Sequence, residues 1–172
     1  MSIRKIYQYP APVLRQKAAR VEKFDENLQK LIADMAETMY DAPGIGLAAP
    51  QIGESLQLLV VHIGNSQEDR QYKAFINPII TEAEGNQIDE EGCLSVPELT
   101  ANVQRHRKIS LTYQDEEGNM QELSTEDRFA VVLQHEIDHL NGILFIDHLS
   151  PLKRNLYKKK IKKAMTAAKE PA

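Results

Sequence analysis

The sequence predicts an α+β protein: one small domain in which antiparallel sheets surround a central helix, with further helices toward both ends of the chain. Three observations support this prediction. Apolar residues recur at helical spacing early in the chain and again from residue 129, and the stretch between is rich in β-branched residues. A basic segment that begins with a capping residue and a proline closes the chain. With 172 residues, 42% of them hydrophobic and 27% charged, we expect a single domain over residues 1–172.

The first predicted helix begins after Asp25, whose side chain suits the N-cap position, and ends before Pro43-Gly44. Its apolar residues are helically spaced: Leu28, Leu31, Ile32, Met35 and Met39. A loop of small residues follows and ends at Gln51. Strands are predicted over residues 56–63, 75–81, 109–113 and 120–123, and the turn residues 117–119 predict that the last two form a hairpin.

Two more helices are predicted in the last third of the chain. One has apolar residues at helical spacing and ends at Asn141-Gly142. Those apolar residues are Phe129, Val132, Leu133, Ile137 and Leu140. The other begins at Ser150-Pro151, where a capping residue precedes a proline at the first helical position, and it covers about residues 150–168.

The apolar runs, the net charge and the cysteine count exclude several classes of protein. No apolar run approaches the ~20 residues of a membrane helix, and the first residues lack an apolar signal-peptide core. We therefore expect a cytoplasmic protein without a membrane partner. A net charge of −4 argues against sequence-specific nucleic-acid binding. The single cysteine, Cys93, excludes an intrachain disulfide and leaves a free thiol.

The strongest chemical signal is His135-Glu136-Ile137-Asp138-His139 on the second predicted helix. Residues four apart lie on one helix face, so His135 and His139 can bind one metal ion. Glu136 projects about 100° away, which places it beside the ion as a candidate general base. A solvated charged face is the alternative, but the apolar residues around the motif predict a buried helix, where unpaired polar groups are costly.

Two histidines leave a divalent ion short of a ligand. His148 lies nine positions after His139, and this spacing does not match the longer zinc-protease motif. The apolar run before it indicates that this segment packs in the core. Cys93, in a turn-like stretch after Gly92, is the better candidate. A lone cysteine is more often a small buried hydrophobe, and that alternative stays open on the residues alone.

Three segments together resemble the peptide deformylase family: Gly44-Ile45-Gly46-Leu47-Ala48-Ala49-Pro50-Gln51, Glu91-Gly92-Cys93-Leu94-Ser95, and Gln134-His135-Glu136-Ile137-Asp138-His139. They occur in the family's order, and the likeness extends from about Ile6 to Asp147. The resemblance implies a metal-dependent hydrolase that removes the formyl group from the N-terminal formyl-methionine of new polypeptides and releases formate. It also implies a small α+β fold with antiparallel sheets around the metal-binding helix.

The resemblance implies a role for each matching residue. Glu136 would take a proton from a water molecule and later deliver it to the departing amine. The side-chain amide of Gln51 and the backbone N–H of Leu94 would stabilise the oxyanion. The implied cofactor is one divalent metal ion, ferrous iron in the cell, with zinc or nickel also found in the family. Its ligands, with water in the fourth position, would be Cys93, His135 and His139.

Recognition of the methionine side chain requires an apolar slot. The candidates to line it, each of which could instead be a turn or core residue, are Gly44, Ile45, Gly46, Leu94, Val131 and Val132. A nearby carboxylate, Glu90 or Glu91, could orient a metal ligand. Many bacterial relatives have an acidic residue and an arginine at the rim, where this chain has Pro43 and Leu99-Thr100.

The last predicted helix carries eight Lys or Arg residues from Lys153 onward. Its apolar residues could form a stripe: Leu152, Leu156, Ile161 and Met165. The resemblance implies that this helix docks on the ribosome near the exit of nascent chains, and the alternative is a solvated helix that keeps the protein soluble.

Three functional hypotheses follow: a deformylase, a metalloprotease with the same helix motif, and a non-catalytic protein with a structural metal. The protease hypothesis leaves Cys93 and the Gln51 loop unexplained. The non-catalytic hypothesis would be favoured if Glu136 or Gln51 were missing, and both are present. The resemblance favours the deformylase.

Overall fold

The computed structural model describes residues 2–169. These residues form three α-helices, α1 (Glu26–Asp41), α2 (Asp127–Leu140) and α3 (Pro151–Lys169), and three short 3-10 helices, η1 (Pro12–Arg15), η2 (Ala49–Ile52) and η3 (Phe145–His148). The strands are β1 (Gly46–Ala48), β2 (Leu58–His62), β3 (Tyr72–Glu84), β4 (Gln87–Cys93), β5 (Val96–Arg105), β6 (Lys108–Gln114) and β7 (Met120–Glu126). The predicted domain ends, residues 1 and 170–172, lie outside the described residues.

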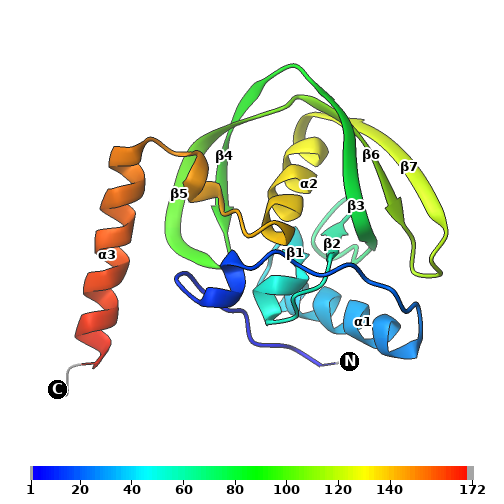
Figure 1. The fold of residues 1–172 in the computed structure, drawn as a ribbon, viewed down its shortest axis with the longest axis horizontal. Helices are drawn as coiled ribbons and strands as arrows, with labels where there is room; N and C mark the ends of the chain where they lie inside the picture. Colours follow the sequence, from blue (N-terminus) through cyan, green and yellow to red (C-terminus); the bar gives the residue numbers. More distant parts are fainter. Residues whose placement is uncertain (1, 170–172) are drawn as a thin grey trace.

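The strands form two antiparallel sheets. Five strands pair in the order β1-β2-β3-β6-β7, and β4 and β5 form a separate hairpin. Helix α2 lies between this hairpin and the larger sheet (Figure 1). The predicted α+β class with a central helix is therefore confirmed.

The larger sheet is covered by a different helix on each face. Alternate residues of a strand point to opposite faces, and β2 shows both environments. Leu58 and Val60 belong to the core cluster that contains α1, whereas Leu59 and Val61 belong to the cluster that contains α2. Because both faces are buried, β2 is a continuous apolar run rather than an alternating one.

The predicted helix ends are confirmed by their hydrogen bonds. The Asp25 carboxylate accepts a hydrogen bond from the Leu28 N–H at 3.1 Å at the start of α1. Ser150 accepts one from the Lys153 N–H at 3.3 Å at the start of α3. Helix α2 ends at Leu140 with Asn141 as its C-cap, and the next residue, Gly142, has a φ of 73° that favours glycine.

The β4–β5 hairpin was not predicted, and the prediction of a turn-like stretch around Cys93 was wrong. Cys93 is the last residue of strand β4, and the turn comprises only Leu94 and Ser95. Three consecutive acidic residues, 89–91, give β4 a low intrinsic strand propensity. Pairing with β5 and the contacts of the buried Glu91 with Arg105 and His135 stabilise the strand instead, and neither can be read from the local sequence.

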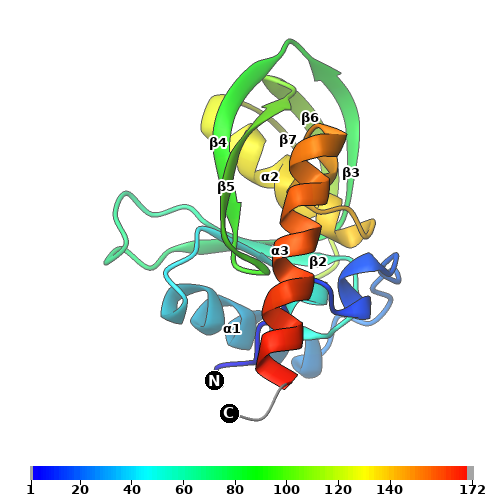
Figure 2. The ribbon, with the colours of Figure 1, turned by 90° about the vertical axis from the view of Figure 1, so that its left-hand side faces the viewer.

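Helix α3 lies on the outer side of the hairpin (Figures 1 and 2). Tyr157 is buried and its hydroxyl donates to the Pro97 carbonyl at 3.1 Å, with Ile161 packed beside it. Leu152 and Leu156 are instead 70% and 59% exposed. The predicted single apolar stripe was therefore wrong, because Ile161 faces the protein while the other apolar residues face away. Within residues 2–169, no helix is long and apolar enough to cross a membrane.

Candidate metal and active site

The three predicted metal ligands lie together. Cys93 ends β4, and His135 and His139 lie one turn apart on α2, with their donor atoms all within 4.8 Å of one another. The Cys93 Sγ is 3.3 Å from the His139 Nε2. Burial lowers the pKa of His135, but its contacts with Cys93, Glu91 and Glu136 raise this pKa more strongly, to about 10. Burial and the charge of His135 hold the pKa of His139 well below its usual value, so His139 is a neutral imidazole that can donate a lone pair. One thiol and two imidazoles at this separation fit a divalent metal ion.

Glu91 fixes the orientation of His135. Its Oε1 accepts a hydrogen bond from the His135 Nδ1 at 2.9 Å, which leaves the Nε2 of the imidazole directed at the cluster. Burial raises the pKa of Glu91, but Arg105 and His135 lower it more strongly, to about 2. Of the two predicted candidates for this role, Glu91 therefore makes the contact, and Glu90 is exposed.

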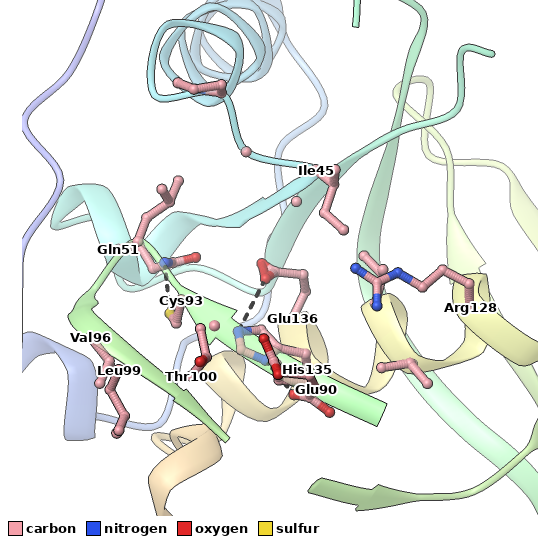
Figure 3. Close-up of a pocket in the computed structure, with 18 of the residues that line it drawn as sticks. Ile45, Gln51, Glu90, Cys93, Val96, Leu99, Thr100, Arg128, His135 and Glu136 are labelled. Carbon is pink, nitrogen blue, oxygen red and sulfur yellow. Dashed lines mark hydrogen bonds and ion pairs between the residues drawn. The ribbon is translucent and has the colours of Figure 1, made fainter. Parts of the chain in front are cut away.

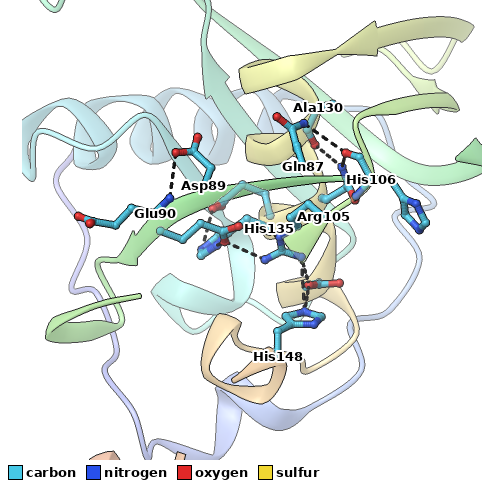
Figure 4. A network of polar contacts seen from close by, with 12 residues as sticks. Gln87, Asp89, Glu90, Arg105, His106, Ala130, His135 and His148 are labelled. Atoms are coloured by element: carbon cyan, nitrogen blue, oxygen red, sulfur yellow. Dashed lines mark hydrogen bonds and ion pairs between the residues drawn. The ribbon is translucent and has the colours of Figure 1, made fainter. Parts of the chain in front are cut away.

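A buried arginine holds Glu91 in turn (Figure 4). The Arg105 Nε and Nη2 both donate to Glu91 at 2.9 Å, and its Nη1 donates to Asp138 at 2.6 Å. The His148 Nε2 is 2.9 Å from the same Asp138 oxygen, so His148 belongs to this network and not to the ligand cluster. Arg105 could not be predicted as a site residue, because it lies at the end of β5 in the unpredicted hairpin.

Gln134 attaches the hairpin to helix α2. Its side-chain amide donates to the His106 carbonyl at 2.8 Å and accepts from the His106 N–H at 3.0 Å. His106 directly follows β5, so this pair of bonds fixes the end of that strand, and with it Arg105, against the motif helix.

Glu136 is buried beside the cluster, with its Oε1 3.7 Å from the His135 Nε2. Its Oε2 has no hydrogen-bond partner among residues 2–169. Burial raises the pKa of this carboxyl to about 7, although the charges of His135 and Arg105 act in the opposite direction. A buried carboxyl with a free oxygen and a pKa near neutrality suits a group that exchanges protons.

Gly46 lies against the side chain of Glu136. A Cβ at this position would be 3.0 Å from the Glu136 Cγ and 3.1 Å from its Cδ. The sequence predicted Gly46 as a lining residue of the methionine slot. Gly46 lines the cavity beside the cluster. Because it has no side chain, it also leaves room for the side chain of Glu136.

Gly46→Ala is expected to displace Glu136 by a few tenths of an ångström and to lower kcat about tenfold, because catalysis is sensitive to small misplacements. The measurement is turnover of a formylated peptide, the substrate that the resemblance implies, at equal metal content. Gly85→Ala is the control for lost stability: its φ of 69° disfavours alanine and its Cβ would lie 3.2 Å from Arg107, but it lies outside the cavity, so kcat should stay unchanged. Unchanged kcat for Gly46→Ala would show that the glycine does not position Glu136.

The amide of Gln51 has a fixed orientation. Its Oε1 accepts a hydrogen bond from the Ala48 N–H at 2.9 Å, so its Nε2 points to the Ser95 hydroxyl at 3.1 Å and to the Cys93 Sγ at 3.6 Å. Leu94 follows Cys93 directly in the hairpin turn. The side-chain donor of Gln51 therefore lies beside the ligand cluster, as Figure 3 shows.

The cluster opens into a cavity of about 490 Å³ between residues 43–46, β4 and α2. All six residues predicted to form the methionine slot line it: Gly44, Ile45, Gly46, Leu94, Val131 and Val132. The rim residues Pro43, Leu99 and Thr100 also line it, together with Arg128, which the sequence analysis did not identify. The helical spacing of Arg128 to Val132 and His135 was the signal that could have found it.

Comparisons with known proteins identify the family to which this chain is similar. The family model for polypeptide deformylase matches residues 3–155. A peptide deformylase of Desulfotalea psychrophila is 65% identical over 164 residues, which cover 95% of this chain and 97% of the relative. The crystal structure of a peptide deformylase from Legionella pneumophila superposes with a TM-score of 0.88 at 46% identity, over 99% of this chain and 100% of that one. For a peptide deformylase from Ehrlichia chaffeensis in complex with actinonin, the TM-score is 0.88 at 37% identity, over 95% and 98% of the two chains.

Proposed function

The chain belongs to the polypeptide deformylase family, and from this premise we propose which of its residues carry out the reaction. The protein is a hydrolase that removes the formyl group from N-terminal formyl-methionine. The observation that carries the proposal is the buried Glu136 carboxylate, with one oxygen unpartnered among residues 2–169, beside the cluster of Cys93, His135 and His139.

The cluster would hold the family's single metal ion, which when bound lowers the pKa of water and polarises the formyl oxygen as a Lewis acid. One thiolate and two imidazoles suit ferrous iron, zinc or nickel. We assign ferrous iron as the metal in the cell, on the resemblance to the family, and zinc or nickel to purified protein, where availability decides the occupant.

Glu136 is the general base and then the general acid. Its carboxylate accepts a proton from water as the water oxygen bonds to the formyl carbon. When the carbon–nitrogen bond breaks, the same carboxyl returns the proton to the methionine nitrogen, and formate leaves. A pKa of about 7 suits both transfers, because the group gives and takes protons with similar ease.

Gln51 and Leu94 stabilise the negative charge that develops on the formyl oxygen. The Gln51 Nε2 is already held toward Cys93 by the bond between its Oε1 and Ala48, so little reorganisation is required. The backbone N–H of Leu94 would supply a second donor from the hairpin turn. Fixed donors of this kind can each contribute about 3 kcal/mol to the transition state.

The peptide binds in the cavity between two strand edges. β1 is the edge strand of the larger sheet, and β4 pairs only with β5, so both expose backbone groups that can bind an extended chain. Gly46 and Gly92 line the cavity on these strands and have no side chains to obstruct a peptide backbone. The methionine side chain then extends along Val131 and Val132.

Formate release from a formyl-Met tripeptide tests this proposal. Protein purified without oxygen and loaded with ferrous iron is expected to release formate, and chelation of the metal to abolish turnover, because the cluster cannot activate water alone. Restoring the metal should restore the rate, which separates loss of metal from loss of fold. Activity that persists in a metal-free sample would contradict the proposed roles.

Helix α3 is proposed to dock on the ribosome. Its exposed surface combines the basic residues with Leu152 and Leu156, a combination that suits an acidic and partly apolar partner. Tyr157 anchors the helix to Pro97 near the cavity, so docking through α3 would hold the active site close to an emerging chain.

Charge reversal at Lys158, Lys159 and Lys163 is expected to weaken ribosome binding at least tenfold, because each lysine lost removes an attraction of about 1 kcal/mol at low salt. Cosedimentation with ribosomes measures the effect, and tripeptide turnover should stay unchanged. Reversal at the exposed Lys17, Lys23 and Lys30, outside α3, is the control with the same change in net charge. Equal ribosome affinity for both sets would exclude docking through this helix.

A cytoplasmic location is proposed on the substrate, because formylated nascent chains arise where translation occurs. The net charge of −4 supports the absence of a sequence-specific nucleic-acid partner.

A further inference from the structure

Arg128 lies on the wall of the cavity that would receive the methionine side chain. It precedes Val132 by one turn of α2 and His135 by two turns, roughly 10 Å along the helix axis. All three residues line the cavity, and Figure 3 shows Arg128 reaching from α2 toward Ile45. A side chain that leaves the reacting end beside His135 and follows this wall reaches Val131 and Val132 first and Arg128 last.

The guanidinium of Arg128 retains unused hydrogen-bond donors. Its Nη1 donates to the Asp89 carboxylate at 2.8 Å, the one hydrogen bond that this side chain makes within residues 2–169. A guanidinium has five N–H donors, so four remain for a ligand. The side chain of Arg128 is 61% exposed and that of Asp89 41%, so the remaining donors are accessible to a ligand in the cavity.

The charges around Arg128 determine which kind of hydrogen-bond acceptor a ligand can place there. Asp89 neutralises the guanidinium, and Glu90, also at the cavity, adds a negative charge. A second carboxylate at this end of the slot would be repelled. The rest of the wall is apolar, because Val131 and Val132 are almost entirely buried valines. The slot therefore suits an uncharged side chain that is apolar along its length and has an oxygen acceptor near its end.

We propose that Arg128 is a specificity-determining residue that allows the slot to accept methionine sulfoxide as well as methionine at the formylated N-terminus. The sulfoxide oxygen accepts a hydrogen bond from the guanidinium, while the methylene groups contact the valines. The inference rests on the proposed function of the same cavity. It adds a substrate class, formylated chains whose first residue has been oxidised.

The test compares kcat/KM for three tripeptides that begin with formyl-methionine, formyl-norleucine or formyl-methionine sulfoxide. Norleucine supplies the apolar reference, since it has similar length and no acceptor. Arg128→Leu is expected to lower the ratio of sulfoxide to norleucine at least about tenfold, the factor that corresponds to one hydrogen bond from a charged donor. Arg128→Lys should retain part of the ratio, because the ammonium keeps a charged donor.

Arg107→Leu is the matched control. Arg107 is also an exposed arginine paired with an aspartate, Asp127 at 3.3 Å, but it does not line the cavity, so the ratio should equal that of the wild type. An unchanged ratio in Arg128→Leu would overturn the inference, as would wild-type protein that processes formyl-methionine but not its sulfoxide. Failure of metal-loaded protein to release formate from any of the peptides would instead refute the proposed function itself, and the inference with it.

Discussion

Glu136→Gln is expected to lower kcat by about three orders of magnitude with little change in KM or in metal content. Glutamine keeps the size of the side chain but cannot accept the proton from water, and general acid–base catalysis contributes about 10²–10⁴-fold to a rate. No second carboxylate in the described chain can replace it, because Glu91 is held by Arg105 and His135. Formate release and metal content measured on the same samples give the comparison.

Glu90→Gln is the control for Glu136→Gln. Glu90 is a second carboxylate at the same cavity, but it is exposed and has no contact with the ligand cluster, so its replacement should change kcat less than threefold. If Glu136→Gln retained more than about a tenth of the wild-type kcat, another group would have to move the proton.

Arg105→Met is expected to destabilise the folded protein by about 3–5 kcal/mol and to weaken metal binding by about 10–100-fold. The methionine fills much of the space but leaves the Glu91 carboxylate buried without its cation, and an uncompensated buried charge is costly. Glu91 would then hold His135 less firmly, and residues that orient metal ligands typically contribute this much to affinity. Urea denaturation and competition with a chelator measure the two effects.

Arg107→Met is the control for stability. Arg107 forms an exposed ion pair with Asp127, for which a loss below about 1 kcal/mol is expected. The double variant Glu91→Gln/Arg105→Met separates the two effects of Arg105. Removing the buried charge should restore part of the stability, whereas metal affinity should stay low because no carboxylate orients His135. A wild-type denaturation midpoint for Arg105→Met would contradict the role assigned to this network.

Local signals predicted the helices and part of the site. Asp25 and Ser150 cap their helices as their residue types suggest, and the histidine motif on α2 places two proposed ligands and Glu136 within one segment. The spacing works because a helix has a fixed period, so positions four apart share a face whatever the rest of the chain does.

The parts that could not be predicted depend on contacts between distant segments. The acidic strand β4 has no recognisable strand pattern, and its pairing with β5 defines it. Arg105 and Asp138 are 33 positions apart and meet through that hairpin. Cys93 could be assigned as a ligand from its motif, but its position at the end of a strand, directly before the Leu94 turn, required the structure.

The division of the proposed metal ligands between two structural units has a consequence for the lifetime of the protein. Cys93 belongs to the small hairpin, whereas both histidines belong to the helix packed on the larger sheet. An ion that binds all three therefore cross-links these units in the folded state and has no equivalent site in the unfolded chain. At a free metal concentration about 1,000 times Kd, such linkage stabilises a fold by about 4 kcal/mol. Metal starvation is thus expected to expose the hairpin to proteolysis and to reduce the abundance of the enzyme as well as its activity.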